Sequence, residues 1–240
     1  MSQPAILVVL HQETSSPGKL GQLLINKGYR LDMRRPRFGD SLPATMDDHA
    51  GAIVFGGPMS ANDGDEFVRR EINWIDVPLI EEAPFLGICL GAQMLVKYLG
   101  GTVTSHCEGC AEIGFYGLHA TPAGRRLLEW PSIVYQWHRE GFDLPRGTEL
   151  LAEGDLFRNQ AFRYGRAAYG IQFHAELTYA MACRWTTHGA ERMRLPGARP
   201  RTDHMTGWFR YDPPVRAWLD LFLDVWLAAD TRRMAASQAA

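Results

Sequence analysis

The sequence predicts an α/β protein with an open, doubly wound, mostly parallel sheet, helices on both faces and a few additional antiparallel strands. Three observations support this fold class. Apolar runs without polar alternation, such as residues 6–10, are typical of strands buried on both faces of a parallel sheet. Segments with helical periodicity separate these runs, and two runs end at glycine turns. In such a sheet, the functional loops lie at the carboxyl ends of the strands.

Strands and helices alternate through the first hundred residues. The apolar runs predict strands at residues 6–10, 52–55 and 84–89. Leucine, isoleucine and phenylalanine recur on one side of the intervening segments, which predicts helices at residues 19–27, 66–82 and 92–99. Pro78 should interrupt the second helix, because proline lacks the N–H that the helix needs.

The second half of the chain changes character. Short strand-like pieces separated by proline and glycine turns predict extra, partly antiparallel strands at residues 113–118, 133–136 and 167–173. A helical stripe over residues 215–227, following Pro213 and Pro214, predicts a last helix that packs on the sheet, with partner binding as the alternative. We find no linker or repeat, so residues 1–240 are expected to form one domain with a frayed, disordered tail at 231–240.

Composition excludes several classes of function. The 240 residues carry 25 Lys and Arg against 27 Asp and Glu, and this formal charge of −2 predicts neither a nucleic-acid nor a membrane partner. A hydrophobic content of 46% with 22% charged residues is typical of a globular protein. The apolar stretch at residues 5–10 is too short for a bilayer and has no basic flank, which predicts a cytoplasmic protein.

Cys89 has the sequence context of a nucleophile. It lies between Gly87 and Gly91, after an apolar strand and before a helical run. This pattern is typical of a sharp strand-to-helix turn, where the flanking glycines remove side chains that would clash. The helix N-terminus beneath the thiol favours the thiolate. The alternative is a buried cysteine that merely ends a core strand.

His174 and Glu176 supply the other groups that a nucleophilic thiol needs. Residues i and i+2 at the end of a strand project to the same side, so both side chains can face one pocket. The imidazole would act as the base and the carboxylate would orient it. We therefore predict a Cys89, His174 and Glu176 triad. An α/β-hydrolase is disfavoured, because there the acid usually precedes the histidine by many residues.

The remaining cysteines and a cluster of arginines give weaker signals. Four cysteines are too few for a disulfide scaffold at this length. Cys107 and Cys110 have redox or zinc spacing, with His106 and His119 nearby, but without a second cysteine pair we predict ordinary thiols and no metal. Residues 192–210 hold five arginines in a predicted solvated loop, with a lid or a docking surface as the alternative: Arg192, Arg194, Arg199, Arg201 and Arg210.

Three segments resemble the signature motifs of the class-I, triad-type glutamine amidotransferases. They are Phe-Gly-Gly-Pro-Met-Ser at residues 55–60, Gly-Ile-Cys-Leu-Gly-Ala-Gln at 87–93 and Gly-Ile-Gln-Phe-His-Ala-Glu at 170–176. Residues 112–114, 134–138 and 159–162 look like the stand-alone branch that resembles the glutaminase domain of GMP synthase. The resemblance covers roughly residues 53–176.

The resemblance implies a flavodoxin-like fold and a glutaminase reaction without a cofactor. Cys89 would attack the side-chain amide carbon of glutamine, and the backbone N–H groups of Gly57 and Leu90 would hold the oxyanion. His174 would pass the thiol proton to departing ammonia, leaving a γ-glutamyl thioester for water to hydrolyse, while Glu176 holds the imidazole tautomer. The resemblance also implies four substrate-binding residues, Gly56, Gln93, Trp137 and His138. A separate synthetase would accept the ammonia.

Two departures from the family pattern concern the site. Trp137 precedes His138 where many relatives have serine, and its larger side chain would reshape the γ-glutamyl pocket. Ala175 stands where many relatives have proline. The first departure keeps open a γ-glutamyl peptidase or hydrolase that acts on a larger γ-glutamyl amide. A non-catalytic regulatory subunit is the third possibility, and the intact triad argues against it.

Overall fold

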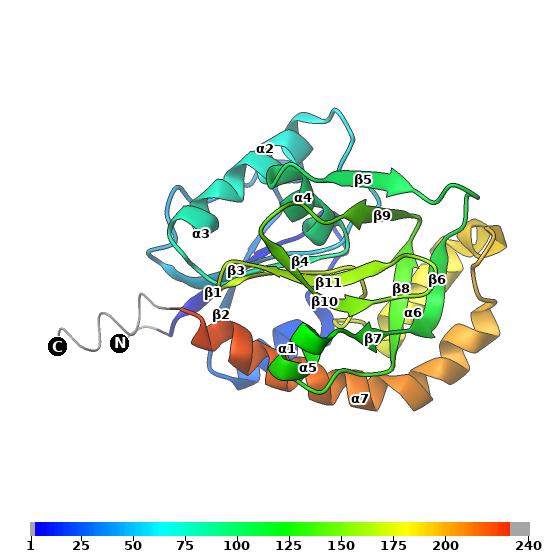
Figure 1. Ribbon diagram of the computed structural model, residues 1–240. Coiled ribbons are helices and arrows are strands. Elements are labelled where there is room, and N and C mark those ends of the chain that lie inside the picture. The colour runs from blue at the N-terminus through cyan, green and yellow to red at the C-terminus, as the bar shows by residue number, and fades with distance from the viewer. Residues whose placement is uncertain (1–2, 231–240) are drawn as a thin grey trace.

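The computed structural model describes residues 3–230 and has an eight-stranded central sheet (Figure 1). The predicted tail at 231–240 lies outside the described residues. In spatial order the strands are β2 (Arg30–Arg34), β1 (Ala5–Val9), β3 (His49–Val54), β4 (Phe85–Ile88), β12 (Ala168–Ile171), β11 (Asn159–Tyr164), β10 (Thr148–Glu153) and β7 (His119–Ala120). The sheet is parallel from β2 to β12 and antiparallel from β12 to β7. The predicted fold class is thus confirmed.

Two small antiparallel sheets flank this central sheet. One pairs β5 (Thr102–Ser105) with β9 (Glu140–Asp143), and the other pairs β6 (Glu112–Gly117) with β8 (Ile133–His138). They contain the strands expected at residues 113–118 and 133–136, whereas the strand expected at 167–173 is β12 of the central sheet, parallel to β4 and antiparallel to β11. The second sheet carries Trp137 and His138 toward the carboxyl ends of the parallel strands, because His174, just after β12, donates its backbone N–H to the carbonyl of Tyr135 at 2.9 Å.

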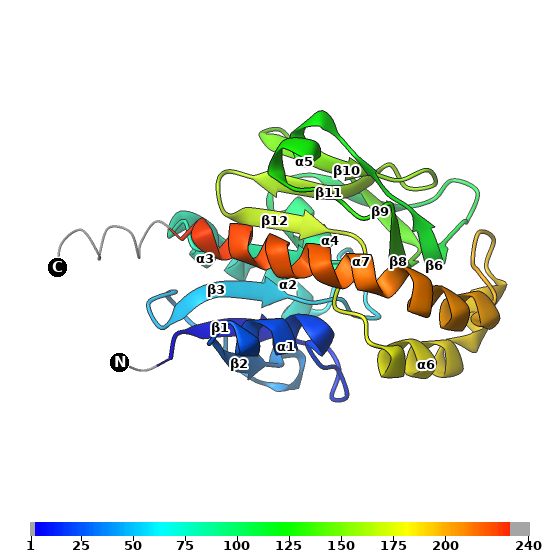
Figure 2. The same ribbon diagram turned by 90° about the horizontal axis from the view of Figure 1, so that it is seen from below.

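Helices cover both faces of the sheet. In β1, Ile6 and Val8 join the core under α1 (Gly18–Asn26) and α7 (Arg201–Ala228), while Leu7 and Val9 join the opposite core under α2 (Glu66–Trp74) and α4 (Leu90–Tyr98). Both faces of β1 are therefore apolar, which explains its unbroken hydrophobic run. Figure 2 shows α7 crossing the sheet with α1 beside it. The shorter helices are α3 (Asp76–Ile80), α5 (Pro122–Leu127), α6 (Tyr179–His188), η1 (Pro36–Phe38) and η2 (Ala190–Arg194).

The last helix corrects one expectation. Instead of starting after Pro213 and Pro214, α7 begins at Arg201 and carries both prolines in its interior. An interior proline costs a helix about 3 kcal/mol. Tertiary contacts before the prolines oppose that cost: the Tyr135 hydroxyl donates a 2.8 Å hydrogen bond to Nδ1 of His204, and the Tyr211 ring lies 5.3 Å from the ring of Phe115.

The expected arginine loop is therefore mostly helical. Arg201 and Arg210 lie on α7, and Arg192 and Arg194 lie in η2, whereas Arg199 lies between these two elements. The helix expected over residues 66–82 is also divided, because α2 ends before Ile75 and Pro78 lies within α3. No helix within residues 3–230 is both long enough and apolar enough to span a bilayer.

Candidate active site

Cys89 occupies a strained turn between β4 and α4. Its backbone angles are φ 51° and ψ −104°, outside the regions that ordinary side chains favour. A Cβ on Gly87 would lie 2.4 Å from the carbonyl oxygen of Gly91, and one on Gly91 would lie 2.0 Å from that of Val54. Only glycine fits at these two positions. The turn thus presents the thiol at the carboxyl edge of the sheet, at the N-terminus of α4.

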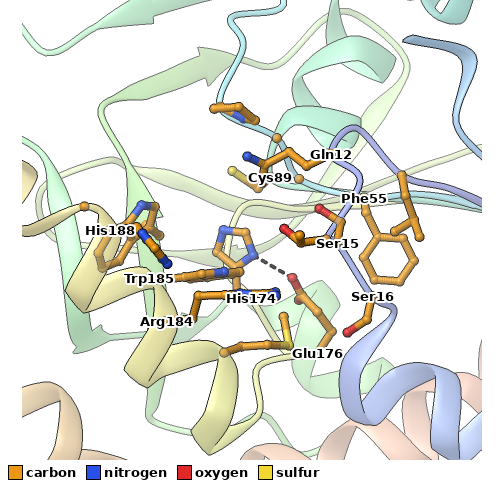
Figure 3. Close-up of a pocket in the computed structure, with 18 of the residues that line it drawn as sticks. Gln12, Ser15, Ser16, Phe55, Cys89, His174, Glu176, Arg184, Trp185 and His188 are labelled. Carbon is orange, nitrogen blue, oxygen red and sulfur yellow. Dashed lines mark hydrogen bonds and ion pairs between the residues drawn. The ribbon is translucent and has the colours of Figure 1, made fainter. Parts of the chain in front are cut away.

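His174 and Glu176 follow β12 and form a buried pair. The Nδ1 atom of His174 lies 2.7 Å from Oε1 of Glu176, and both residues are almost fully buried. Among the described residues, Nε2 of His174 has no hydrogen-bond partner, so it is available to the thiol or to a substrate. A Cβ on Gly56 would lie 2.9 Å from Cε1 of His174 and 3.4 Å from Cβ of Cys89. The three predicted triad members therefore lie together at one cavity (Figure 3).

The charges around His174 favour its protonated form. Burial alone would lower the pKa of the imidazole, but the charges of Glu176 and Cys89 outweigh it and raise the pKa to about 10. An imidazolium beside a sulfur atom stabilises the thiolate, which is the nucleophilic form of cysteine. The arrangement can therefore support nucleophilic attack by Cys89 at neutral pH.

Helix α1 fixes the backbone at Glu176. The N–H of Lys19 donates to the carbonyl oxygen of Glu176 at 3.0 Å, and a Cβ on Gly18 would lie 2.1 Å from the same oxygen. The ammonium of Lys19 is paired with Asp212 of α7. Burial lowers the pKa of Lys19 to about 8, although the charge of Glu176 opposes that shift. Helix α1 therefore fixes the backbone of Glu176, and the Lys19 side chain links α1 to α7.

The two residues whose backbone N–H groups are predicted to hold the oxyanion, Gly57 and Leu90, lie close together above a buried pair of polar side chains. A Cβ on Gly57 would lie 3.1 Å from Cδ2 of Leu90, so the glycine turn packs against the start of α4. Beneath this turn, His11 lies 3.1 Å from the carbonyl oxygen of Gly56 through Nδ1 and 2.7 Å from Glu71 through Nε2. Neither His11 nor Glu71 was among the predicted site residues. His11 directly follows the first predicted strand, and this position at the carboxyl end of a strand could have identified it as a site residue.

A cavity of about 480 Å³ opens over the thiol (Figure 3). Six of the predicted site residues line it, which are Gly56, Gly57, Cys89, Trp137, His174 and Glu176. Leu90, Gln93 and His138 do not line it. Further lining residues come from two segments, with Gln12, Thr14, Ser15 and Ser16 before α1, and Met181, Arg184, Trp185 and His188 on α6.

Gln93 and His138 instead belong to a buried polar network. Both side chains contact the carbonyl oxygen of Glu140, Gln93 through Nε2 at 3.0 Å and His138 through Nδ1 at 2.9 Å. Gln93 also donates to Oε1 of Gln172 at 3.1 Å, and Nε2 of His138 lies 3.0 Å from Glu112. In this arrangement the two residues fix the β9 backbone behind the site, and their predicted contact with substrate stays a prediction.

Helix α6 builds one wall of the cavity. Its Trp185 ring meets His174 edge-on at 4.8 Å between centroids and lies 5.8 Å from the ring of Trp137. Gly189, at the end of α6, permits this packing, because a Cβ there would lie 2.7 Å from the Trp137 ring. No helix was predicted over the residues of α6. Its signals are an N-cap at Thr178, whose hydroxyl accepts the Met181 N–H at 3.2 Å, and the glycine at its end.

A second group of polar side chains lies outside this cavity, between β5 and β6. The potential ligand atoms of His106, Glu108 and Cys110 lie within 4.8 Å of one another, at partly or fully exposed positions. Cys107 is not part of the group. Exposed groups of this kind are common without an ion, so ordinary thiols at Cys107 and Cys110 stay the prediction. All four cysteines are free.

Comparisons with known proteins agree with the motifs and the fold. The sequence model of the family described as glutamine amidotransferase class-I matches residues 20–182. The glutamine amidotransferase-like protein YfeJ of Salmonella typhimurium is 32% identical over 180 residues, covering 71% of this chain and 74% of YfeJ. One subunit of the glutamine-hydrolyzing GMP synthase of Methanocaldococcus jannaschii is 30% identical over 136 residues, covering 54% of this chain and 65% of its own length. A solved glutamine amidotransferase from Thermotoga maritima has a TM-score of 0.85 and 28% identity, covering 95% of this chain and 99% of its own.

Proposed function

Because this chain belongs to the class-I glutamine amidotransferase family, we propose that it hydrolyses a γ-glutamyl amide through a thioester on Cys89. Glutamine is the simplest such substrate, and its products are glutamate and ammonia. The observation that carries the proposal is the meeting of Cys89, His174 and Glu176 at an open cavity. A strained turn, a buried imidazole and an orienting carboxylate are together the features of a nucleophilic catalyst.

The first half-reaction would form the thioester. The Cys89 thiol has already passed its proton to Nε2 of His174, and the resulting thiolate attacks the amide carbon. Negative charge develops on the amide oxygen, and the backbone N–H groups of Gly57 and Leu90 would donate hydrogen bonds to it. The C–N bond then breaks, and His174 gives its proton to the departing nitrogen. In the second half-reaction, water attacks the thioester with His174 as base, and the thiol is regenerated.

Glu176 would orient His174 throughout this cycle. Its contact with Nδ1 leaves Nε2 directed at the reacting atoms, and its charge stabilises the imidazolium formed in each half-reaction. The raised pKa of His174 supports the same role, because a protonated imidazole is the form that donates to the leaving nitrogen. No step of this reaction requires a cofactor.

The destination of the ammonia forms the wider part of the proposal. The relative from Methanocaldococcus jannaschii is named as one subunit of GMP synthase, which supports a separate ammonia-accepting synthetase as the partner of this chain. A free nucleophilic thiol is compatible with a reducing compartment, and the proposal therefore keeps the cytoplasm as the location.

A γ-glutamyl peptidase or hydrolase is the second candidate, favoured by the cavity. The cavity of about 480 Å³ continues from the thiol along α6 to His188, and a larger amine could occupy this extension. The chemistry would be identical, with a larger amine as the leaving group. A non-catalytic regulatory subunit is disfavoured, since such a protein has no need for a strained cysteine beside a buried imidazole and carboxylate.

The test measures glutamate and amine release from glutamine and from larger γ-glutamyl amides. We expect Cys89→Ala to lose at least about 10³-fold in rate and His174→Ala nearly as much, because the covalent route is lost. Glu176→Gln should be milder, because it keeps the shape and loses only the charge. Cys107→Ser and Cys110→Ser serve as controls and should retain near-native rates. Equal losses in all three cysteine variants would refute the assignment of Cys89.

A further inference from the structure

The chemistry of His174 identifies the side of the cavity on which the leaving amine lies. The group that donates a proton to the departing nitrogen must lie next to it. Trp185 of α6 packs directly on His174, with 4.8 Å between ring centroids. The oxyanion groups lie elsewhere, at the glycine turn after β3 and the start of α4. We therefore expect the wall formed by α6 and η2 to face the amine half of the substrate.

The cavity continues along this wall beyond the space that ammonia needs. Ammonia is about the size of a water molecule, which takes up ~30 Å³ in the liquid. The whole cavity, which also has to hold the γ-glutamyl half, measures about 480 Å³ and extends along α6 as far as His188 and into η2 at Arg192. A substrate with an extended amine half would fill this part of the cavity, whereas glutamine would leave it to water.

Arg184 gives this part of the cavity an uncompensated positive charge. Its side chain lines the cavity, is partly buried and makes no hydrogen bond or ion pair with any residue in the described range 3–230. Two acidic residues line the same cavity, and neither is paired with Arg184: Glu176 contacts His174 through Oε1 at 2.7 Å, and Glu191 lies 4.0 Å from Arg192. A planar guanidinium with free donors is well suited to a carboxylate, which it can bind through two parallel hydrogen bonds.

From these observations we propose that Arg184 binds a carboxylate on the leaving amine, so that the preferred substrates are γ-glutamyl amides of amino acids or short peptides. This inference rests on the proposed γ-glutamyl hydrolase function and specifies its substrate class. The chemistry is the thioester route already described, with the nitrogen of an amino acid replacing ammonia as the leaving group. Arg184 takes no part in proton transfer and contacts only the distal carboxylate.

The experiment compares two substrates that differ only in that carboxylate. γ-Glutamylglycine carries it, whereas γ-glutamylglycinamide has a neutral group of the same shape. A hydrogen bond between charged groups stabilises binding more than one to a neutral amide. We therefore expect the wild-type kcat/KM to be roughly 10- to 100-fold higher for γ-glutamylglycine than for γ-glutamylglycinamide. Arg184→Gln should bring the ratio of the two kcat/KM values close to one, and Arg184→Lys should keep part of the preference. Arg166→Gln, at an exposed turn outside the cavity, removes the same charge and should leave the ratio as in the wild type.

The outcomes separate this inference from the function on which it rests. A wild-type ratio near one, or an unchanged ratio in Arg184→Gln, overturns the carboxylate subsite while glutamine hydrolysis still supports the proposed function. If folded wild-type protein released no amine from glutamine or from either dipeptide compound, both proposals would fail. Thermal melting of each variant verifies that a lost preference does not come from unfolding.

Discussion

At the residue scale, His174 links the proposed catalysis to stability. The ordinary pKa of an imidazole is 6.5, and the folded protein raises that of His174 to about 10, because the charges of Glu176 and Cys89 overcome the effect of burial. A pKa that is higher in the folded state means that protonation favours folding. This contribution is complete below pH 6.5 and is lost as the pH rises through about 10.

Glu176→Gln should weaken this dependence on pH. The substitution removes a charge that raises the pKa of His174, so the free energy of unfolding should fall less steeply between pH 6.5 and 10 than in the wild type. Urea denaturation at several pH values across this interval measures the effect. Glu153→Gln removes a carboxylate from an exposed pair with Arg158 and should keep the wild-type slope. Identical slopes for Glu176→Gln and the wild type would contradict the assigned cause.

The sequence indicated those site residues whose neighbours in the chain also belong to the site. Cys89 lies between two glycines, and His174 and Glu176 are two positions apart, so local patterns were sufficient to select them. His11 and Glu71 are 60 positions apart and are joined only by the fold. Trp185 likewise acquires its place from the packing of α6 against His174. Such contacts depend on tertiary structure, and no local pattern encodes them.

At the scale of elements, the turn between β4 and α4 depends on two glycines. We expect Gly91→Ala to destabilise the protein by about 2 kcal/mol or more, because its Cβ would lie 2.0 Å from the carbonyl oxygen of Val54 and the β3 backbone would have to move. Chemical denaturation measures this loss, and the rate of γ-glutamyl amide hydrolysis should fall with it, since the Cys89 turn would shift.

Gly64→Ala is the matched control for this substitution. A Cβ there would meet no atom within 4 Å, and the backbone does not require glycine. Its effect on stability should stay within about 0.5 kcal/mol. The argument would be wrong if Gly91→Ala were as harmless as Gly64→Ala.

Among the elements, the strands with the strongest apolar runs were predicted, and elements defined by tertiary packing were missed. β1, β3 and β4 are buried on both faces, so their sequences carry an unambiguous signal. The edge strand β2 has the mixed sequence Arg-Leu-Asp-Met-Arg and lacks such a run. The first half of α7 was assigned to a loop because Pro213 and Pro214 indicated a helix start, whereas contacts with β6 and β8 extend the helix upstream.

At the scale of the whole molecule, early and late segments of the chain are interleaved. β12, from the second half, pairs with β4 from the first half, and α7 covers strands from both. We therefore propose that the chain folds as one cooperative unit. The candidate site depends on the same interleaving, because Cys89 follows β4 and His174 follows the adjacent β12. Any loss of packing between the halves would separate the thiol from its base.

Two leucines on α7 test this cooperativity. Leu223 is completely buried in the core beneath the sheet, whereas Leu221 is 57% exposed. Leu223→Ala should lower the free energy of unfolding by about 2 to 5 kcal/mol, and Leu221→Ala should change it by less than about 0.5 kcal/mol. If the chain unfolds as one unit, the urea transitions followed by far-UV circular dichroism and by tryptophan fluorescence should coincide, and Leu223→Ala should move both equally. Two separated transitions, or a shift in only one signal, would show that α7 unfolds independently of the sheet.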